Sequence, residues 1–448
     1  MALSGLDIFK QLPQTNCGDC GVPTCLAFAM KLAQGQAELS ACPHVSEEAA
    51  AALAESAAPP MRGVTVGAGE TAFTVGEETV LFRHDKTFVN PCAFATRIQA
   101  DWADSDIDAA VEAANAASFE RVQQELRVGT LAVASSGDAA RFREVVERVS
   151  GATSLPLILM EQDTSSMGGA LEVVASKKPL LYAATEENFE SMLALAKQHE
   201  CPLAVRAEGL EALAVLTEKA AGAGVKDLVI DSAPATAGQA LRDHVFARRA
   251  ALEQKFAPLG YPIITFPGDL AEGDEMLEVM FAAADVLKYG SIIVLSDARP
   301  ERLLPLLVLR QNIYTDPQRP MQVEQKVYEF GEPGPDAPLL VTTNFSLTYF
   351  IVAGEIEAAK KPARLAVVDC EGLSVLTAWA AGKFVPERIA KMILDSGVGE
   401  QLEKQEIVLP GMVAQISGEL SEELDGWSIV VGPREASDIP AFMKQRAS

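Results

Sequence analysis

Four cysteines near the N-terminus have the types and spacing of a metal centre. Cys17, Cys20, Cys25 and Cys42 form the pattern C-x₂-C-x₄-C-x₁₆-C, and Pro43 follows the last of them. Three close thiolates and one distant thiolate suit a [4Fe–4S] cluster, which is held by four cysteines. Structural zinc is the alternative, but zinc sites usually have two separated pairs of ligands, often with histidine. The pattern therefore predicts an iron–sulfur cluster on these four thiolates.

The last third of the chain has four loops that each follow a short apolar strand. We expect strands at 339–343, 364–369, 406–410 and 428–433, followed by loops at 342–346, 369–374, 410–413 and 432–435. Such loops meet at one edge of a parallel α/β sheet, where ligands bind. Gly372, Gly411 and Gly432 would let a ligand approach the backbone, and helix N-termini can receive phosphate. The loops favour a nucleotide-containing cofactor; the alternative is that the glycines only make turns.

The elements that position these two sites predict an α/β multidomain chain. We expect a cluster domain at 1–57, a linker with a β-hairpin at 58–92, a barrel at 93–311, a second linker at 312–338 and a Rossmann-like α/β domain at 339–448. The Ala-rich stretch 46–60, which ends in a proline pair, is typical of a helix that leaves the first domain.

The central region alternates short apolar runs with helical patterns. The expected strands are 97–101, 130–135, 156–160, 179–184, 202–207, 227–232, 262–267 and 291–296, and helices are expected at 105–126, 138–150 and 187–200. Eight such units match a (β/α)₈ TIM-type barrel, although a doubly wound open sheet has the same local pattern. The polar residues near the expected strand ends are Asp101, Glu161, Gln162, Asp163, Arg206, Asp231 and Asp297. No phosphate-binding loop accompanies them, so a scaffold or docking role is favoured over a small-molecule site.

Composition excludes some classes of partner. The 448 residues carry 37 Lys+Arg against 62 Asp+Glu, a net charge of −25, and no region is basic. Nucleic acid and anionic membrane surfaces require concentrated positive charge, so neither is an expected partner. We expect no signal peptide and no membrane span, and hence a cytoplasmic protein with reduced thiols. Cys92 and Cys201 lack metal-site spacing and are expected to be buried.

The cysteine motif, the barrel and the last domain together resemble the large (gamma) subunit of the corrinoid iron–sulfur protein of the anaerobic acetyl-CoA (Wood–Ljungdahl) pathway. The resemblance covers essentially the whole chain. Its most specific parts are TTNFSLTYF at 342–350 and DCEGLSVLTAW at 369–379. The cysteine motif alone is shared with other electron-transfer proteins.

The resemblance implies a methyl carrier rather than an enzyme. A corrinoid would cycle between Co(I) and methyl-Co(III), taking a methyl group from methyltetrahydrofolate through a methyltransferase and giving it to acetyl-CoA synthase/CO dehydrogenase. The [4Fe–4S] cluster would re-reduce Co(II). A small subunit would complete a heterodimer. The four histidines lie at 44, 84, 199 and 244. The corrinoid is therefore expected to be base-off, with no histidine from the last domain on cobalt.

The resemblance also implies the site residues. Cys17, Cys20, Cys25 and Cys42 would hold the cluster. The expected corrinoid contacts are Thr342, Thr343, Asn344, Ser346, Cys370, Glu371, Gly372, Leu373, Ser374, Gly411 and Pro433. Two alternatives stay open: an iron–sulfur electron-transfer protein without corrinoid, and a pterin-dependent methyltransferase barrel that uses Asp101 and Asp231.

Overall fold

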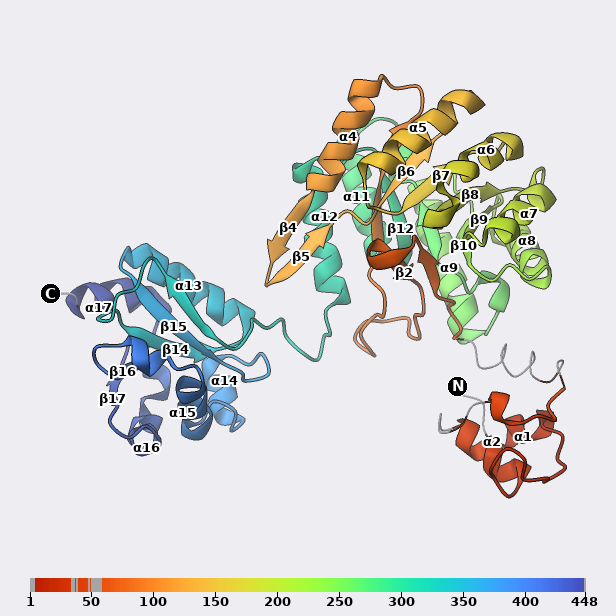
Figure 1. Ribbon diagram of the computed structural model, residues 1–448. Coiled ribbons are helices and arrows are strands. Elements are labelled where there is room, and N and C mark those ends of the chain that lie inside the picture. Colours follow the sequence, from red (N-terminus) through yellow and green to blue (C-terminus); the bar gives the residue numbers. More distant parts are fainter. Residues whose placement is uncertain (1–4, 34–36, 38, 47–48, 50–58, 447–448) are drawn as a thin grey trace.

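The structure is a computed structural model that describes residues 5–33, 37, 39–46, 49 and 59–446. Most of the helix expected over 46–60, and the boundary expected at residue 57, lie outside the described residues. Figure 1 shows the barrel, the N-terminal helices and the C-terminal sheet as separate bodies along the chain.

The N-terminal region is a small helical unit. It contains α1 (Gly5–Gln11), α2 (Cys25–Ala33) and the 3₁₀ turn η1 (Leu39–Ala41). Ile8 and Leu12 pack with Phe28 and Ala29 in a cluster that Cys20, Cys25 and Cys42 also join. A core this small supplies little burial, so thiolate–metal bonds would add much of the unit's stability.

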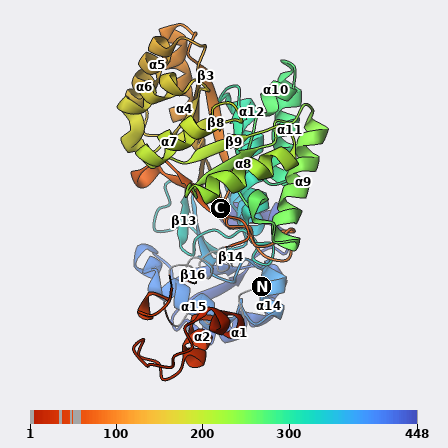
Figure 2. The same ribbon diagram turned by 90° about the vertical axis from the view of Figure 1, so that its right-hand side faces the viewer.

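The central region is a closed barrel of eight parallel strands, as the strand count predicts. Its strands are β3 (Ala93–Gln99), β6 (Thr130–Ala134), β7 (Leu157–Met160), β8 (Leu180–Ala184), β9 (Leu203–Arg206), β10 (Leu228–Asp231), β11 (Ile263–Thr265) and β12 (Gly290–Leu295). The helices around it are α4 (Asp104–Ala116), α5 (Ala139–Ala152), α6 (Thr164–Val174), α7 (Phe189–His199), α8 (Leu210–Gly222), α9 (Ala237–Glu253), α10 (Pro267–Leu270), α11 (Glu275–Leu287) and α12 (Pro300–Tyr314). Figure 2 shows α7, α8 and α9 on the outside of the strands.

Burial on both faces explains why these strands are continuous apolar runs. Every residue of β6, β8 and β12 is buried. Aspartates cap several of the helices that follow: the side chain of Asp138 accepts from two backbone N–H groups at the start of α5, and that of Asp274 does the same for α11. Short polar caps and apolar runs therefore fix this region locally.

The expected β-hairpin closes the N-terminal end of the barrel. It consists of β1 (Val64–Val66) and β2 (Phe73–Val75), which pair antiparallel. Val64, Val66 and Val75 belong to the apolar cluster that fills the barrel interior. The N–H of Gly67 donates to the carbonyl of Lys178, just before β8, at 2.9 Å. The hairpin is thus part of the barrel core.

One expected helix is wrong over its second half. The helix expected over 105–126 ends at Ala116, and β4 (Ser118–Arg121) and β5 (Gln124–Arg127) form an antiparallel hairpin instead. Glu and Gln in 118–127 permit a helix locally, but the hairpin buries Val122 and Leu126 against the rest of the chain. Tertiary packing overrides the helix propensity here.

The C-terminal region is a five-stranded sheet with helices on both faces. Its strands are β13 (Val327–Phe330), β14 (Leu339–Thr343), β15 (Ala363–Val368), β16 (Glu406–Leu409) and β17 (Ser428–Val431), in the order β13-β15-β14-β16-β17. Its helices are α13 (Ser346–Ala359), α14 (Val375–Ala380), α15 (Pro386–Asp395), α16 (Ser417–Glu423) and α17 (Ile439–Arg446).

Four of these strands are parallel, and β13 pairs antiparallel with β15 at the edge. Strand β13 lies inside 312–338, the stretch expected to be only a linker. The residues around β13 are polar and rich in Gly and Pro, so the sequence gives no clear signal for this four-residue edge strand. Among the described residues, no helix has both the length and the apolar character to cross a membrane.

The valines of the β1–β2 hairpin pack in the barrel interior, so we expect this hairpin to stabilise the barrel. Val66→Ala and Val75→Ala should each lower the free energy of unfolding of the barrel by about 2 kcal/mol, because each removes two buried methyl groups and leaves a cavity. Native-state hydrogen exchange of the β3 and β8 amides measures it. Thr65→Ala, on the exposed face of the same hairpin, should change it by less than about 1 kcal/mol. Equal effects of all three substitutions would contradict a stabilising role for the buried valines of this hairpin.

Candidate functional site

The cysteine loop is held by hydrogen bonds from one asparagine. The side chain of Asn16 accepts from the N–H of Cys25 at 2.8 Å, and the N–H of Asn16 lies 3.4 Å from the Cys25 sulfur. Gly18 and Gly21 have φ of +81° and +77°. Other L-residues rarely adopt this conformation, so these two glycines allow the loop to bend between the thiols.

The placement of the thiols suits a multi-iron cluster better than one zinc ion. A tetrahedral zinc with bonds of about 2.3 Å would hold its sulfurs about 3.8 Å apart. Among the described residues, the one group of three metal-ligand side chains within 4.8 Å is Cys17, Asp19 and His44. The other three thiols are not in that group. A [4Fe–4S] cluster places its thiolates on different irons, so they need not converge on one point.

His44 has a partner other than a metal. Its Nε2 lies 2.7 Å from a carboxylate oxygen of Asp19. This hydrogen bond lowers the pKa of Asp19 below its ordinary value, with a smaller effect from the Cys17 thiol. The pair lies on the exposed side of the cysteine loop.

A crevice opens at the carboxyl edge of the C-terminal sheet. It has a volume of about 290 Å³ and a mainly apolar wall. Three of the expected cofactor residues line it: Thr342, Ser374 and Pro433. Gly411 lies between two further lining residues, Pro410 and Met412. The four loops expected to share one edge do meet there.

Two neighbouring hydroxyls of β14 differ in orientation. Side chains alternate along a strand, so Thr342 and Thr343 point to opposite faces. Thr342 lines the crevice and Thr343 does not. The Oγ1 atoms of both are buried and have no hydrogen-bond partner in the structure. Such a hydroxyl is costly unless a ligand pairs with it, and only Thr342 is placed to meet one.

Asn344 holds the loops together from behind the crevice. Its side-chain oxygen accepts from the N–H groups of Cys370 and Gly372, at 2.9 and 3.0 Å. Its side-chain nitrogen donates to Gln322 and Asp369, at 3.0 and 2.9 Å. All four donor and acceptor capacities are used, so Asn344 positions the edge and has none left for a ligand.

The thiol of Cys370 points into the core. Cys370 is fully buried and belongs to the cluster on the α15 face of the sheet. Burial raises the pKa of this thiol to about 12. Its sulfur lies 3.5 Å from the carbonyl of Lys383. A neutral thiol in that place is not available to cobalt.

The remaining expected residues support the loops. Glu371 pairs with the ammonium of Lys383. A Cβ on Gly372, which has φ of +72°, would lie 2.9 Å from the carbonyl oxygen of Pro320. A Cβ on Gly411 would lie 2.5 Å from the carbonyl oxygen of Gly432. These two glycines therefore serve close backbone approaches. Ser346 and Leu373 lie in the same loops and do not line the crevice.

Sequence reasoning missed the helical wall of the crevice. Thr348 and Val352 of α13 and Ile439 of α17 line it, together with Arg434 and Glu435 of the last loop. Residues 348 and 352 are four apart, which places them on one face of α13. That spacing is the one available signal, and it is the same for any amphipathic helix.

The barrel candidates have structural partners. Tyr182 donates to the buried carboxylate of Asp231 at 2.7 Å, and Arg206 pairs with the same oxygen at 3.2 Å. The other oxygen accepts from the N–H of Ala233. Burial raises the pKa of Asp231. The adjoining cavity is only about 100 Å³. That volume is below the range usual for small-molecule sites, which favours a scaffold role at this end of the barrel.

Three of the other polar candidates have local roles. Asp163 caps α6, and Glu161 accepts from two backbone N–H groups of the same turn. Asp297 accepts from Arg299 and Arg302. Asp101 is exposed just after β3 and Gln162 follows β7.

The cysteines expected to be buried are buried. Cys92 and Cys201 are 1% and 4% exposed. Burial raises their pKa values to about 12 and about 11.

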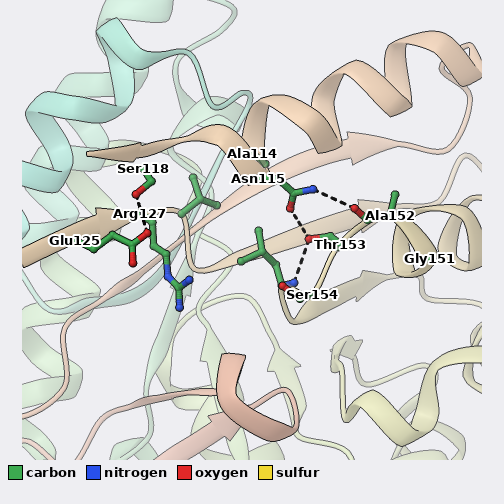
Figure 3. A pocket seen from close by; sticks show the side chains of 11 residues that line it. Ala114, Asn115, Ser118, Glu125, Arg127, Gly151, Ala152, Thr153 and Ser154 are labelled. Carbon is green, nitrogen blue, oxygen red and sulfur yellow. Dashed lines mark hydrogen bonds between the residues drawn. The ribbon is translucent and has the colours of Figure 1, made fainter. Parts of the chain in front are cut away.

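A larger cavity of about 480 Å³ lies at the opposite end of the barrel (Figure 3). The hydroxyl of Thr153 donates to Asn115 at 2.6 Å, and Asn115 donates to the carbonyl of Ala152 at 3.0 Å. These groups lie at the C-terminal ends of α4 and α5 and in the loop that precedes β7, whereas barrel active sites lie at the carboxyl ends of strands. This cavity contains none of the expected site residues.

Comparisons with known proteins agree with this arrangement. The family model for the CO dehydrogenase/acetyl-CoA synthase delta subunit matches residues 63–443, and a model described as an Fe-S cluster matches residues 12–44. The corrinoid/iron-sulfur protein large subunit of Moorella thermoacetica is 47% identical, covering 99% of each chain. The acetyl-CoA decarbonylase/synthase complex subunit gamma of Methanopyrus kandleri is 35% identical, covering 99% of this chain and 98% of its own.

Among solved structures, dihydropteroate synthase from Thermus thermophilus matches 57% of this chain and 100% of its own, with a TM-score of 0.40 and 16% identity. This likeness is too distant to bear on ligand or activity. The two full-length relatives and the family model are decisive, and this chain belongs to the family of corrinoid/iron–sulfur protein large subunits and acetyl-CoA decarbonylase/synthase gamma subunits.

Proposed function

We propose that this chain is a methyl-group carrier in acetyl-CoA synthesis and does not itself catalyse the transfers. The observation that carries the proposal is the 47% identity to a corrinoid/iron-sulfur protein large subunit over the full length. When bound, a corrinoid would supply a cobalt able to carry a methyl group from methyltetrahydrofolate to acetyl-CoA synthase, and a [4Fe–4S] cluster would supply the electron that reactivates it.

The residues of the C-terminal edge fit part of a corrinoid. The crevice has an apolar wall and one unpartnered buried hydroxyl, that of Thr342. Its volume of about 290 Å³ suits one arm of so large a cofactor, with the macrocycle on the surface outside. Leu376 and Trp379 of α14 are large apolar residues exposed beside this edge. Thr342, Ser374 and Pro433 would line the arm, and Gly411 would keep two loops close together.

No histidine or cysteine of this domain would ligate the cobalt in this proposal. The four histidines lie outside the C-terminal domain, and the thiol of Cys370 is buried in the core. These two facts support a corrinoid without a histidine or cysteine ligand from this domain, and we propose that it is base-off. A weakly ligated cobalt favours the reduced, nucleophilic form.

The partners follow from the same role. A carrier must bind a methyltransferase and acetyl-CoA synthase/CO dehydrogenase in turn, and a small subunit would complete a heterodimer. We place the complex in the cytoplasm. Neither nucleic acid nor a membrane is a proposed partner, because the chain is acidic.

Metal analysis tests the proposal as a whole. Protein purified without oxygen, together with its small subunit, should contain about four irons and about one cobalt per heterodimer. Iron without cobalt would contradict the carrier and favour a simple electron-transfer protein. Methyl transfer from the folate donor without added methyltransferase would instead favour a catalytic barrel.

The cluster assignment predicts which thiols matter for iron. Cys17→Ala, Cys20→Ala, Cys25→Ala or Cys42→Ala should each remove most of the iron, because each takes away one of four ligands. Cys201→Ala is the matched control, since its thiol is buried in the barrel, and it should keep the iron. Iron retained in any two of the four variants would rule out this ligand set.

The unpartnered hydroxyl of Thr342 allows a more specific test of corrinoid binding. Thr342→Val keeps the shape and removes one hydrogen bond to the ligand, so it should raise the Kd for a cobamide about three- to tenfold. Bound cobalt in equilibrium dialysis measures it. Thr343→Val removes an equally unpartnered hydroxyl on the opposite face and should leave the Kd unchanged. Without cofactor, both variants should be at least as stable as the wild type. Equal loss of binding in both would show that the crevice is not the site.

A further inference from the structure

The β4–β5 hairpin of the barrel reaches the C-terminal domain (Figure 1). Val122 at its tip is 8% exposed and belongs to the same apolar cluster as Val323 and Leu340. The side-chain oxygen of Gln123 accepts from the N–H of Glu324 at 2.7 Å. The side-chain nitrogen of Gln123 donates to the hydroxyl of Tyr328 on β13. The tip therefore joins two regions by one apolar and two polar contacts.

The tip residues have a conformation that their types disfavour. Val122 and Gln123 have φ of +52° and +60°. Two-residue hairpin turns of this kind prefer Asn-Gly or Asp-Gly, and a β-branched residue there is an outlier. Local turn preference does not explain Val122. Its contact with the C-terminal domain does, since that contact needs an apolar side chain.

The segment that the tip contacts runs along the cofactor edge. We call residues 320–325 the strap. The N–H of Val323 donates to the carbonyl of Asn344 at 2.9 Å, and the N–H of Ser346 donates to the carbonyl of Met321 at 3.0 Å. The side chain of Gln325 accepts from the N–H of Asp369 at 2.7 Å. Two of the four edge loops thus rest on the strap.

A second anchor lies beside the tip, at Arg121, the last residue of β4. The guanidinium of Arg121 donates to the side chain of Gln311 on α12 and lies 3.7 Å from the sulfur of Met321. The side chain of Gln311 donates back to the carbonyl of Arg121 at 3.0 Å. Arg121 therefore ties the hairpin to the barrel on one side and to the strap on the other.

The rest of this junction is loosely packed. A cavity of about 580 Å³ lies between the hairpin, the end of α12 and the residues that lead into the strap. Its wall includes charged and polar side chains such as Arg310, Asp316 and Arg319. Small, polar contacts between domains usually allow relative motion. The tip contacts are therefore the specific part of the junction.

We propose that the β4–β5 hairpin is a latch: it holds the strap, and through it the loops at 344–346 and 369–372, in one position, and its release frees the C-terminal domain to turn against the barrel. The meaning of these loops as a corrinoid edge rests on the proposed function. The latch itself concerns this chain alone. Gln123 is a positioning residue in this scheme, since it acts on the edge through Glu324.

Hydrogen exchange of the full chain, without added cofactor, tests the latch. Gln123→Ala should speed exchange at the amides of 321–325 and 344–346 about three- to tenfold, the loss expected for one or two hydrogen bonds. Val122→Asn keeps a residue that favours the turn and removes the apolar contact, so it should speed the same amides while β4 and β5 stay protected. Gln198→Ala, at an exposed position of α7, is the matched control and should change none of them.

These exchange measurements test the latch independently of the proposed corrinoid binding. If Gln123→Ala also exposes the amides of β4 and β5, the hairpin has unfolded and Val122→Asn decides. Unchanged exchange at 321–325 and 344–346 in Val122→Asn would overturn the latch. Small-angle scattering should show a larger radius of gyration in both latch variants. None of these readouts needs bound corrinoid, so a failed cobalt analysis would leave them intact.

Discussion

The side chain of Asn344 is the interaction on which the C-terminal edge depends. It links three segments that are far apart in sequence: its own loop after β14, the loop at 369–372 after β15, and Gln322 of the strap. A parallel sheet brings strand ends together but does not fix the loops beyond them. One buried amide with all its bonds made can do so, and an aspartate there could not donate to Gln322.

Burial of the strands decides which features of the fold could be predicted from the sequence. The barrel strands and three of the four parallel strands of the last domain, β14, β15 and β16, are largely buried, so their apolar runs identify them in the sequence. The hairpin at 118–127 and strand β13 gain their stability from distant residues, as Val122 does from the cluster around Val323. Their own sequences permit a helix and a linker. Local patterns cannot report a contact that exists only after the domains meet.

The same distinction applies to the candidate site. The loops after each strand were predictable, because topology alone places them at one edge. The role of each residue within them was not. Asn344 and Gly372 lie in the expected loops yet serve the backbone, and Thr343 differs from Thr342 only by the alternation of a strand. Thr348 lines the crevice from α13, and nothing in the sequence of that helix distinguishes it from other amphipathic helices. Family motifs therefore mark a neighbourhood, and geometry separates lining residues from supporting ones.

The seven thiols fall into two groups: three enclosed in the folded domains, and four in the N-terminal unit that we propose as cluster ligands. Cys92, Cys201 and Cys370 are enclosed, and burial raises their pKa values to about 11 or 12, so they remain neutral small apolar groups. Cys17 is exposed on a loop with two left-handed glycines, around a core too small to enclose it. Metal binding requires thiolates, which a well-packed interior disfavours. Of the four N-terminal cysteines, Cys17 is exposed, Cys20 and Cys42 are half-buried and Cys25 packs in the small core.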